Sequence, residues 1–162
     1  MDDKFYMKEA LKRAKAAYKD GETPIGAVIV KDGKIIATGR NLREKRKNAL
    51  CHGEIIAINR ACKKLDSWRL VDCDLYVTLE PCAMCAGAII NARIRRVIYG
   101  ASDYKAGSFG SLVNLSELPY NHKPQITSGV MEEECATLLS SFFKELRETK
   151  KKIKSLNEEN DK

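Results

Sequence analysis

The sequence lacks the features of a secreted or membrane protein. No window approaches the roughly 20 consecutive apolar residues that a membrane-spanning helix requires. The first twenty residues, MDDKFYMKEALKRAKAAYKD, are charged throughout and contain no apolar signal-peptide core. We therefore expect a cytoplasmic protein with no membrane contact, in a reducing compartment where disulfide bonds are rare.

Linkers and repeats are also missing. No internal repeat, no proline- or serine-rich linker and no shift in composition precede the last dozen residues. A chain of 162 residues buries about two thirds of the surface that it exposes when unfolded, so it needs no disulfides to stay folded. We expect a single domain over residues 1–150 and a frayed, charged C-terminal tail over residues 151–162.

Positive charge is in excess. The formal net charge is +7, and much of it lies in the segments KRAK, REKRK, RIRR and KKKIK. A basic surface favours an anionic partner such as nucleic acid. Solvated surface faces have the same composition, however, and charge alone does not separate RNA from DNA.

Hydrophobic spacing and turn signals predict alternating helices and strands. Apolar residues at helical intervals predict a helix over residues 2–20, and Asp32-Gly33 joins two β-rich runs into a hairpin within residues 23–41. A helix, a strand, a helix, two strands and a helix follow, over residues 51–65, 74–80, 82–92, 95–101, 124–130 and 131–154. This order predicts an α/β fold with one mixed sheet and helices on its faces.

The six cysteines divide into two groups. Cys51, Cys62, Cys73 and Cys135 are dispersed, and we interpret them as buried packing residues. Cys82 and Cys85 instead follow Pro81, which suits the first turn of a helix. Unpaired backbone N–H groups at a helix start stabilise thiolates, so this pair is suited to bind a metal.

One of only two histidines lies at a matching position. His52 stands near the start of the predicted helix over 51–65, and Glu54 follows two residues later. If the two helices pack side by side, their N-termini face one point, where one imidazole and two thiolates can hold zinc. Three protein ligands leave the fourth position to water. Glu54, beside the metal but not bound to it, can take a proton from that water and return it to a leaving group.

Three other interpretations use the same residues. Cys-x-x-Cys alone is also the pattern of a redox pair, which would leave His52 and Glu54 unexplained. A structural zinc could take its fourth ligand from Cys51, Cys73 or His122. A non-catalytic, zinc-stabilised RNA-binding module is the third alternative, and it would not require Glu54.

The whole pattern resembles a known family. His-x-Glu followed by Pro-Cys-x-x-Cys is the signature of the zinc-dependent cytidine/deoxycytidylate deaminase superfamily. The segments PIGAVIV, SWRL, LYVTLEPCAMCAGAII, IYGASDYKAGSFGSLVNL and ECATLLSSFFKELR further resemble the bacterial tRNA-specific adenosine deaminases, over about residues 5–148. The resemblance implies a three-layer α/β/α cytidine-deaminase-like fold with a five-stranded mixed sheet flanked by helices. It also implies a homodimer that acts on a tRNA anticodon stem-loop and hydrolyses the wobble adenosine to inosine.

The resemblance implies roles for the four residues of the metal site. His52, Cys82 and Cys85 would bind one Zn2+ ion per subunit. Glu54 would be the catalytic residue, which carries a proton from the activated water to the purine N1 and then toward the departing ammonia.

The resemblance also implies a set of substrate contacts. Asn41 would hydrogen-bond the base, Asp103 would accept a hydrogen bond from a ribose 2′-hydroxyl, and Phe143 would stack on a flanking nucleotide. The other matching positions are Pro24, Ile25, Gly26, Ala27, Gly53, Lys105, Asn121 and Arg147. Each has an ordinary structural interpretation as well, such as a turn asparagine, a capping aspartate, a core aromatic or a surface charge.

Two departures from the family pattern lie next to the site. The family's alanine between the histidine and the glutamate is Gly53, and its Asp-Pro-Thr-Ala segment is Asn48-Ala49-Leu50-Cys51. Losing the proline removes a rigid turn beside the pocket. This motivates an alternative substrate, a free nucleobase or nucleoside of the guanine, cytosine or adenosine type, which would not need the RNA contacts.

Overall fold

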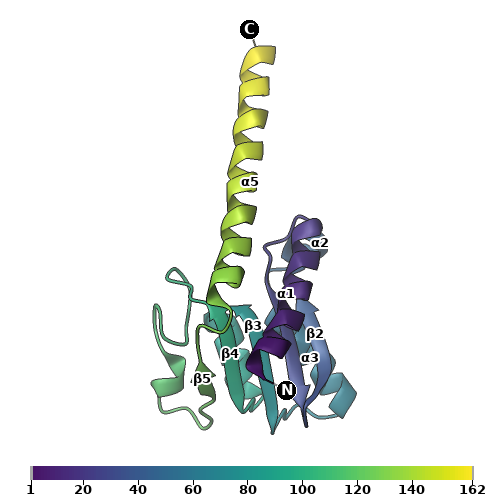
Figure 1. Cartoon of the computed structure of the whole chain (residues 1–162), viewed down its shortest axis with the longest axis vertical. Coiled ribbons are helices and arrows are strands. Elements are labelled where there is room, and N and C mark those ends of the chain that lie inside the picture. The colour runs from purple at the N-terminus through teal and green to yellow at the C-terminus, as the bar shows by residue number, and fades with distance from the viewer. Residues whose placement is uncertain (1, 162) are drawn as a thin grey trace.

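A five-stranded sheet lies between two layers of helices in the computed structural model, which describes residues 2–161 (Figure 1). Two short elements, α2 and η1, add to the order that the sequence predicts. The elements are α1 (Asp3–Lys19), β1 (Gly26–Lys31), β2 (Lys34–Arg40), α2 (Arg43–Arg46), α3 (Gly53–Leu65), β3 (Cys73–Leu79), α4 (Ala83–Asn91), β4 (Arg96–Ala101), η1 (Leu115–Glu117, a 3-10 turn), β5 (Gln125–Thr127) and α5 (Glu132–Asn160).

The sheet is mixed, as the sequence predicts. Its strand order is β2-β1-β3-β4-β5. β1 pairs antiparallel with both β2 and β3, whereas β3, β4 and β5 run parallel to one another. The expected five-stranded mixed sheet with flanking helices is therefore confirmed.

Strand β1 shows why the protein has two cores. Successive side chains of a strand point to opposite faces of the sheet. Ala27 and Ile29 belong to the core beneath α3 and α4, while Val28 and Val30 belong to the core beneath α1 and α5. Both faces of the central strands are thus buried, which explains their nearly continuous apolar runs.

Close backbone packing holds α3 on the sheet at the end that carries the candidate site. A Cβ atom at Gly39 of β2 would lie 2.1 Å from the carbonyl oxygen of Gly53 and 2.8 Å from the amide nitrogen of Ala57. Only glycine permits this approach. The N-terminus of α3, and with it His52, is therefore held against the carboxyl end of β2.

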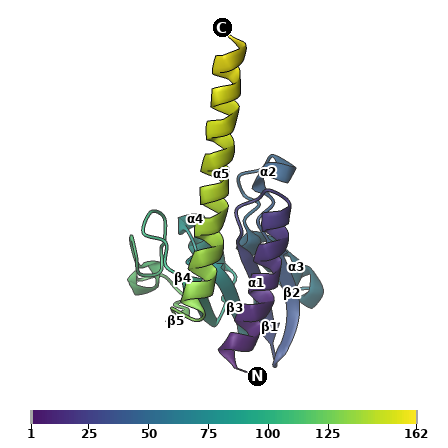
Figure 2. The ribbon, with the colours of Figure 1, turned by 45° about the horizontal axis from the view of Figure 1, so that its top comes forward.

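Helix α5 projects beyond the rest of the molecule as one long helix (Figures 1 and 2). The sequence predicts a frayed tail over 151–162, but residues 151–160 continue α5 as exposed helix, and Lys162 lies outside the described residues. No glycine or proline interrupts the chain after residue 131, and acidic residues fill the first turn. Neither α5 nor any other helix within residues 2–161 is both long and apolar enough to cross a membrane.

The substitution Gly39→Ala is expected to destabilise the protein, because the added Cβ would push α3 away from β2. Overpacking of this kind costs about 1–3 kcal/mol. Gly87→Ala is the matched control, since a Cβ at Gly87 on α4 meets no other atom within 4 Å. Alanine is the better helix former by about 0.5–1 kcal/mol, so this control should be slightly stabilised. Urea unfolding followed by circular dichroism measures both, and equal midpoints for the two variants would contradict the packing argument.

Candidate active site

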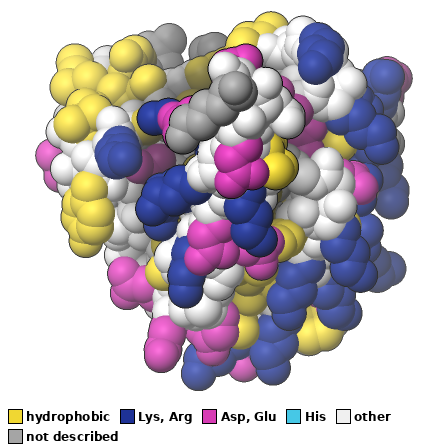
Figure 3. Space-filling model, turned by 90° about the horizontal axis from the view of Figure 1, so that it is seen from above, with side chains coloured by type: hydrophobic (Ala, Val, Ile, Leu, Met, Phe, Trp, Pro, Cys, Tyr) yellow, Lys and Arg dark blue, Asp and Glu magenta, His cyan; other side chains and the backbone are white. Residues whose placement is uncertain are grey.

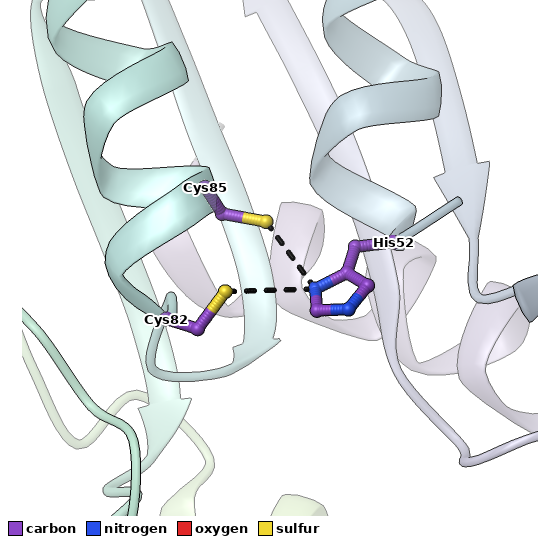
Figure 4. Close-up of side chains that lie close together, drawn as sticks. All are labelled: His52, Cys82 and Cys85. Atoms are coloured by element: carbon purple, nitrogen blue, oxygen red, sulfur yellow. Dashed lines mark hydrogen bonds between the residues drawn. The ribbon is translucent and has the colours of Figure 1, made fainter. Parts of the chain in front are cut away.

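His52, Cys82 and Cys85 meet where α3 and α4 begin side by side (Figure 4). His52 Nδ1 lies 3.6 Å from Cys82 Sγ and 3.5 Å from Cys85 Sγ, and the three ligand atoms all lie within 4.8 Å of one another. A nitrogen and a sulfur bound to one tetrahedral zinc at ordinary bond lengths are about 3.6 Å apart. The donor set therefore fits a single zinc ion.

The local fold leaves these three side chains available. His52 and Cys82 occupy the capping positions of α3 and α4, and neither side chain hydrogen-bonds to the backbone of its helix. Cys85 lies one turn into α4 and is fully buried. A helix start supplies unpaired N–H groups that favour thiolates, so the position suits the ligand type.

The two thiols have very different proton affinities. A hydrogen bond from Cys85, with another from His52, lowers the pKa of Cys82 to about 4. The hydrogen bond to Cys82, burial and the nearby Glu54 raise the pKa of Cys85 instead. The hydrogen bond to Cys82 also raises the pKa of His52. A cation that binds here must replace the proton held between the two sulfurs, so metal binding and proton release are coupled.

Glu54 is the unusual acid of the site. Its side chain is only 3% exposed, and burial raises its pKa above the ordinary range. Within residues 2–161, its Oε2 atom is the buried side-chain oxygen that has no hydrogen-bond partner. Leaving a buried acceptor unpaired costs free energy, so this atom is suited to meet water or substrate. Glu54 lies beside the metal ligands and is not one of the three clustered donors.

The alternatives that need a fourth protein ligand are not supported. The metal-type cluster found among the described residues contains three donors. Cys51 packs with Leu42 and Ile56 in a small apolar cluster, and Cys73 begins β3 at the opposite end from Cys82. The Nε2 atom of His122 lies 2.6 Å from the carbonyl oxygen of Ile94, away from the cluster.

Five of the expected substrate contacts line one cavity of about 630 Å³ between α5 and the strand ends. They are Ile25, Asp103, Lys105, Phe143 and Arg147, joined by Thr23, Arg43, Leu79, Leu139 and Ser140. None of His52, Glu54, Cys82 and Cys85 lines this cavity. Its wall residue Ile25 packs against the residue next to His52, because a Cβ at Gly53 would lie 3.4 Å from the carbonyl oxygen of Ile25. We call it the active-site cavity.

The other expected wall residues have packing roles. A Cβ at Gly26 would lie 2.0 Å from the carbonyl oxygen of Ala10, so Gly26 faces α1. Ala27 is buried in the core beneath α3 and α4, and Pro24 is buried as well. Of the segment 24–27, only Ile25 lines the active-site cavity. The prediction that all four form the pocket wall therefore exceeds what the structure brings together.

Asn41 is held in a tight turn after β2. Its backbone N–H donates to the carbonyl oxygen of Ile25 at 3.1 Å, and its Oδ1 accepts from the N–H of Arg43 at 3.1 Å. Its side chain is almost fully buried. The amide oxygen thus has the turn role that the sequence left open as an alternative, and the side-chain NH2 group is the part left for a base.

Asn121 does not join the other expected contacts within one chain. It is exposed in the loop before β5. The first residues of β4 and β5, Arg96 and Gln125, pair at one end of the parallel strands, whereas Cys82 follows the other end of β3. Sequence alone gave no sign of this separation, because it depends on the strand pairing.

Sequence reasoning missed Glu80, which organises the loop that carries Asp103. Glu80 is 2% exposed, and its carboxylate accepts hydrogen bonds from the backbone N–H groups of Asp103 at 3.2 Å and of Phe109 and Ser111 at 3.1 Å. A Cβ at Gly107 would lie 2.4 Å from the Glu80 carboxylate. The available signal was a glutamate inserted between an apolar strand and the Pro-Cys pair.

Glu22 is a second buried acid that the sequence analysis did not identify. Its Oε1 accepts from the N–H of Lys45 at 2.6 Å and its Oε2 from the N–H of Glu44 at 3.2 Å. These bonds fix α2, whose Arg43 lines the active-site cavity. Glu22 and Glu80 therefore position loops on two sides of the site.

Comparison with known proteins places the chain in a family. The sequence model of the MafB19-like deaminases matches residues 1–147. The tRNA-specific adenosine deaminase of Bacillus subtilis (strain 168) is 53% identical over 150 residues, which cover 92% of this chain and 93% of that protein. The tRNA-specific adenosine deaminase of Streptococcus pyogenes serotype M1 is 47% identical over 156 residues, 96% of this chain and 91% of that protein.

Solved structures agree with the sequence comparison. A structure from a study of A-to-I editing by tRNA deaminases at the wobble position of transfer RNA matches with a TM-score of 0.81 and 46% identity, over 83% of this chain and 99% of that one. The guanine deaminase of Bacillus subtilis matches with a TM-score of 0.61 and 44% identity, over 63% and 66%. The chain therefore belongs to the bacterial tRNA-specific adenosine deaminase family, within the cytidine/deoxycytidylate deaminase superfamily.

Proposed function

We propose that this protein hydrolyses the wobble adenosine of a tRNA anticodon loop to inosine and ammonia. The observation that carries the proposal is the convergence of His52, Cys82 and Cys85 beside the unpaired carboxylate oxygen of Glu54. Its relatives named tRNA-specific adenosine deaminase support the same reaction and substrate.

His52, Cys82 and Cys85 would hold one zinc ion per subunit. When bound, zinc supplies a Lewis acid that lowers the pKa of water to near neutrality. The ligand atoms suit this metal because imidazole and thiolate groups bind zinc in preference to harder cations such as magnesium or calcium. The capping positions of His52 and Cys82 place the backbone of both residues at the starts of two neighbouring helices.

Glu54 would move the protons of the reaction. In the hydrolysis, a bond forms between a water oxygen and adenine C6, and the bond from C6 to the exocyclic nitrogen breaks. Oε2 of Glu54 takes one proton from the attacking water and delivers it to N1. It then takes the proton of the new hydroxyl group on C6 and delivers it to the departing ammonia, so that C6 becomes the carbonyl carbon of inosine. Burial raises the pKa of Glu54 above that of an exposed carboxyl group, which favours its role as a group that must both accept and donate a proton.

The active-site cavity has the chemistry expected of a site for a loop nucleotide. Its volume of about 630 Å³ falls in the usual range for ligand sites. Arg43, Lys105 and Arg147 supply positive charge for phosphates, and the partly exposed ring of Phe143 supplies a stacking surface. Asp103 would accept from a ribose hydroxyl and so favour RNA over DNA. An unpaired loop adenosine enters such a site at low cost.

The proposal includes a homodimer and a cytoplasmic location. Asn121 supports the homodimer, since it lies at the opposite end of the parallel strands from Cys82 within one chain. A second copy could bring Asn121 to the same RNA loop. Light scattering of the purified protein is expected to give twice the mass of the chain, and a stable monomer would remove this part of the proposal.

A deaminase of free nucleobases or nucleosides is the second candidate. The segment Asn48–Cys51 departs from the family, and Leu50 within it is 58% exposed beside the site. The partial match to a guanine deaminase favours the same alternative. Three cations on the active-site cavity favour a polyanionic substrate instead. The assay described next separates the two.

Incubation with an adenosine-containing anticodon stem-loop, followed by digestion to nucleosides, is expected to yield inosine. Glu54→Gln should lower kcat at least about 100-fold, because a carboxamide cannot transfer the proton. Its zinc content, measured by mass spectrometry of the metal, should equal that of the wild type. Glu133→Gln, an exposed change at the start of α5, is the control. Turnover of free guanine, cytosine or adenosine with none of the stem-loop would favour the second candidate.

Iodoacetamide at pH 6 is expected to modify Cys82 first in metal-free protein. The pKa of about 4 keeps this thiol ionised there. Burial raises the pKa of Cys73, and it raises the pKa of Cys135 to about 12. One equivalent of zinc should protect Cys82, because coordination removes the free thiolate. Peptide mass spectrometry measures the rate at each cysteine. Equal rates at the three cysteines, or no protection by zinc, would contradict the metal assignment.

A further inference from the structure

A second cavity, lined mainly by basic residues, also adjoins α2. It has a volume of about 380 Å³, and we call it the basic cavity. Its lining residues are Arg13, Thr38, Gly39, Arg40, Leu42, Lys45, Arg46, Ile56 and Arg60. Five of these are cations and none is an acid. In Figure 3, Lys and Arg side chains gather on the same side of the molecule as α1, α2 and α3.

The five cations converge on the cavity from separate elements. Arg13 comes from α1 and Arg60 from α3, which cover opposite faces of the sheet around the edge strand β2. Arg40 ends β2, and Lys45 and Arg46 lie on α2. A run of charge on a single helix is often only a solvated face. Five cations that meet at one concave site from four elements are a stronger sign of an anion site.

Most of this charge is not neutralised by the protein. Of the five cations, Arg40 is the one that forms an ion pair within residues 2–161. Its Nη2 atom lies 2.9 Å from Oδ2 of Asp20. The Nη1 atom of Arg60 donates to the carbonyl oxygen of Thr38 at 2.9 Å, which fixes its guanidinium at the cavity. Like charges held together repel, so an anion in the cavity would relieve an unfavourable interaction.

The backbone beneath the cations is fixed by the buried carboxylate of Glu22. Its hydrogen bonds to the N–H groups of Glu44 and Lys45 hold α2 in place. Lys45 and Arg46 are therefore presented to the cavity by a rigid turn. Guanidinium groups bind phosphate oxygens in a two-pronged geometry, and four arginines beside one lysine suit a phosphate better than a single carboxylate.

The position of α2 connects the basic cavity to the active site. Arg43 lines the active-site cavity, while Lys45 and Arg46, on the same short helix, line the basic cavity. We propose that the basic cavity binds a backbone phosphate of the RNA strand that flanks the target adenosine. This inference rests on the proposed function, since it takes the RNA in the active-site cavity as its starting point.

The test replaces Arg13, Arg46 and Arg60 together by glutamine in the full chain. Lys15→Gln, Lys34→Gln and Lys64→Gln together form the matched control, because they lie on α1, β2 and α3, are exposed and do not line the basic cavity. Fluorescence anisotropy measures binding of an anticodon stem-loop at several salt concentrations. The arginine variant should bind at least about tenfold more weakly at low salt. Each lost phosphate contact should reduce the slope of log K against log salt by about 0.7–0.9.

Activity gives an independent readout of the same contact. At saturating stem-loop the arginine variant should keep the wild-type kcat, while its KM rises, because these residues do not touch the reacting atoms. Thermal melting checks that the variant is folded. Arg46→Gln alone, at an exposed position on α2, is a milder second variant and should also reduce the salt slope. Wild-type affinity and slope in both folded variants would overturn the inference.

Inorganic phosphate and pyrophosphate distinguish the source of the anion. If wild-type protein binds them and the arginine variant does not, while both bind RNA equally, the cavity serves a free phosphate compound and the RNA assignment is wrong. If wild-type protein makes no inosine but still binds the stem-loop through these arginines, the proposed reaction fails and the inference about the cavity stands.

Discussion

The site depends on how closely helix α3 approaches the sheet. Gly39 removes the side chain that would otherwise separate β2 from the first turn of α3. That contact determines how far His52 and Glu54 lie from the sheet. Cys82 and Cys85 lie at the same end of the sheet, because α4 follows β3 after the short connection that contains Glu80 and Pro81. The cluster of His52, Cys82 and Cys85 at two helix starts is thus a result of packing distances in the layer below it.

Buried acids and exposed cations have different roles around this site. Glu22 and Glu80 are almost completely buried, and their carboxylates accept hydrogen bonds from backbone N–H groups of α2 and of the loop after β4. The basic side chains that those loops and α2 carry point to cavities. Buried charge therefore fixes the backbone, and the charge that lines the two cavities is available to the RNA that we propose as substrate. Glu54 is the exception, a buried acid whose Oε2 atom has no hydrogen-bond partner.

Local sequence patterns were sufficient to predict the order of the main elements and the convergence of His52, Cys82 and Cys85. Cys82 and Cys85 directly follow a predicted strand, and His52 precedes Glu54 at a predicted helix start. These positions alone indicate that the side chains lie at helix N-termini. The pairing that separates Asn121 from the site could not be predicted, because it depends on which strands become neighbours. The helical state of residues 151–160 was missed for a different reason. A charged run without glycine or proline resembles both a solvated helix and a tail.

The web of hydrogen bonds around Glu80 has a consequence for how such enzymes diverge. This carboxylate sits under the loop of Asp103 and Lys105 and sets their positions without facing the cavity. Exchanging the residues beneath that loop would retune which nucleotide is accepted, while every side chain on the cavity wall stayed the same. Relatives with identical cavity-lining residues could then differ in nucleotide preference through the residues that support this loop. Comparisons limited to cavity-lining positions would overlook such a difference.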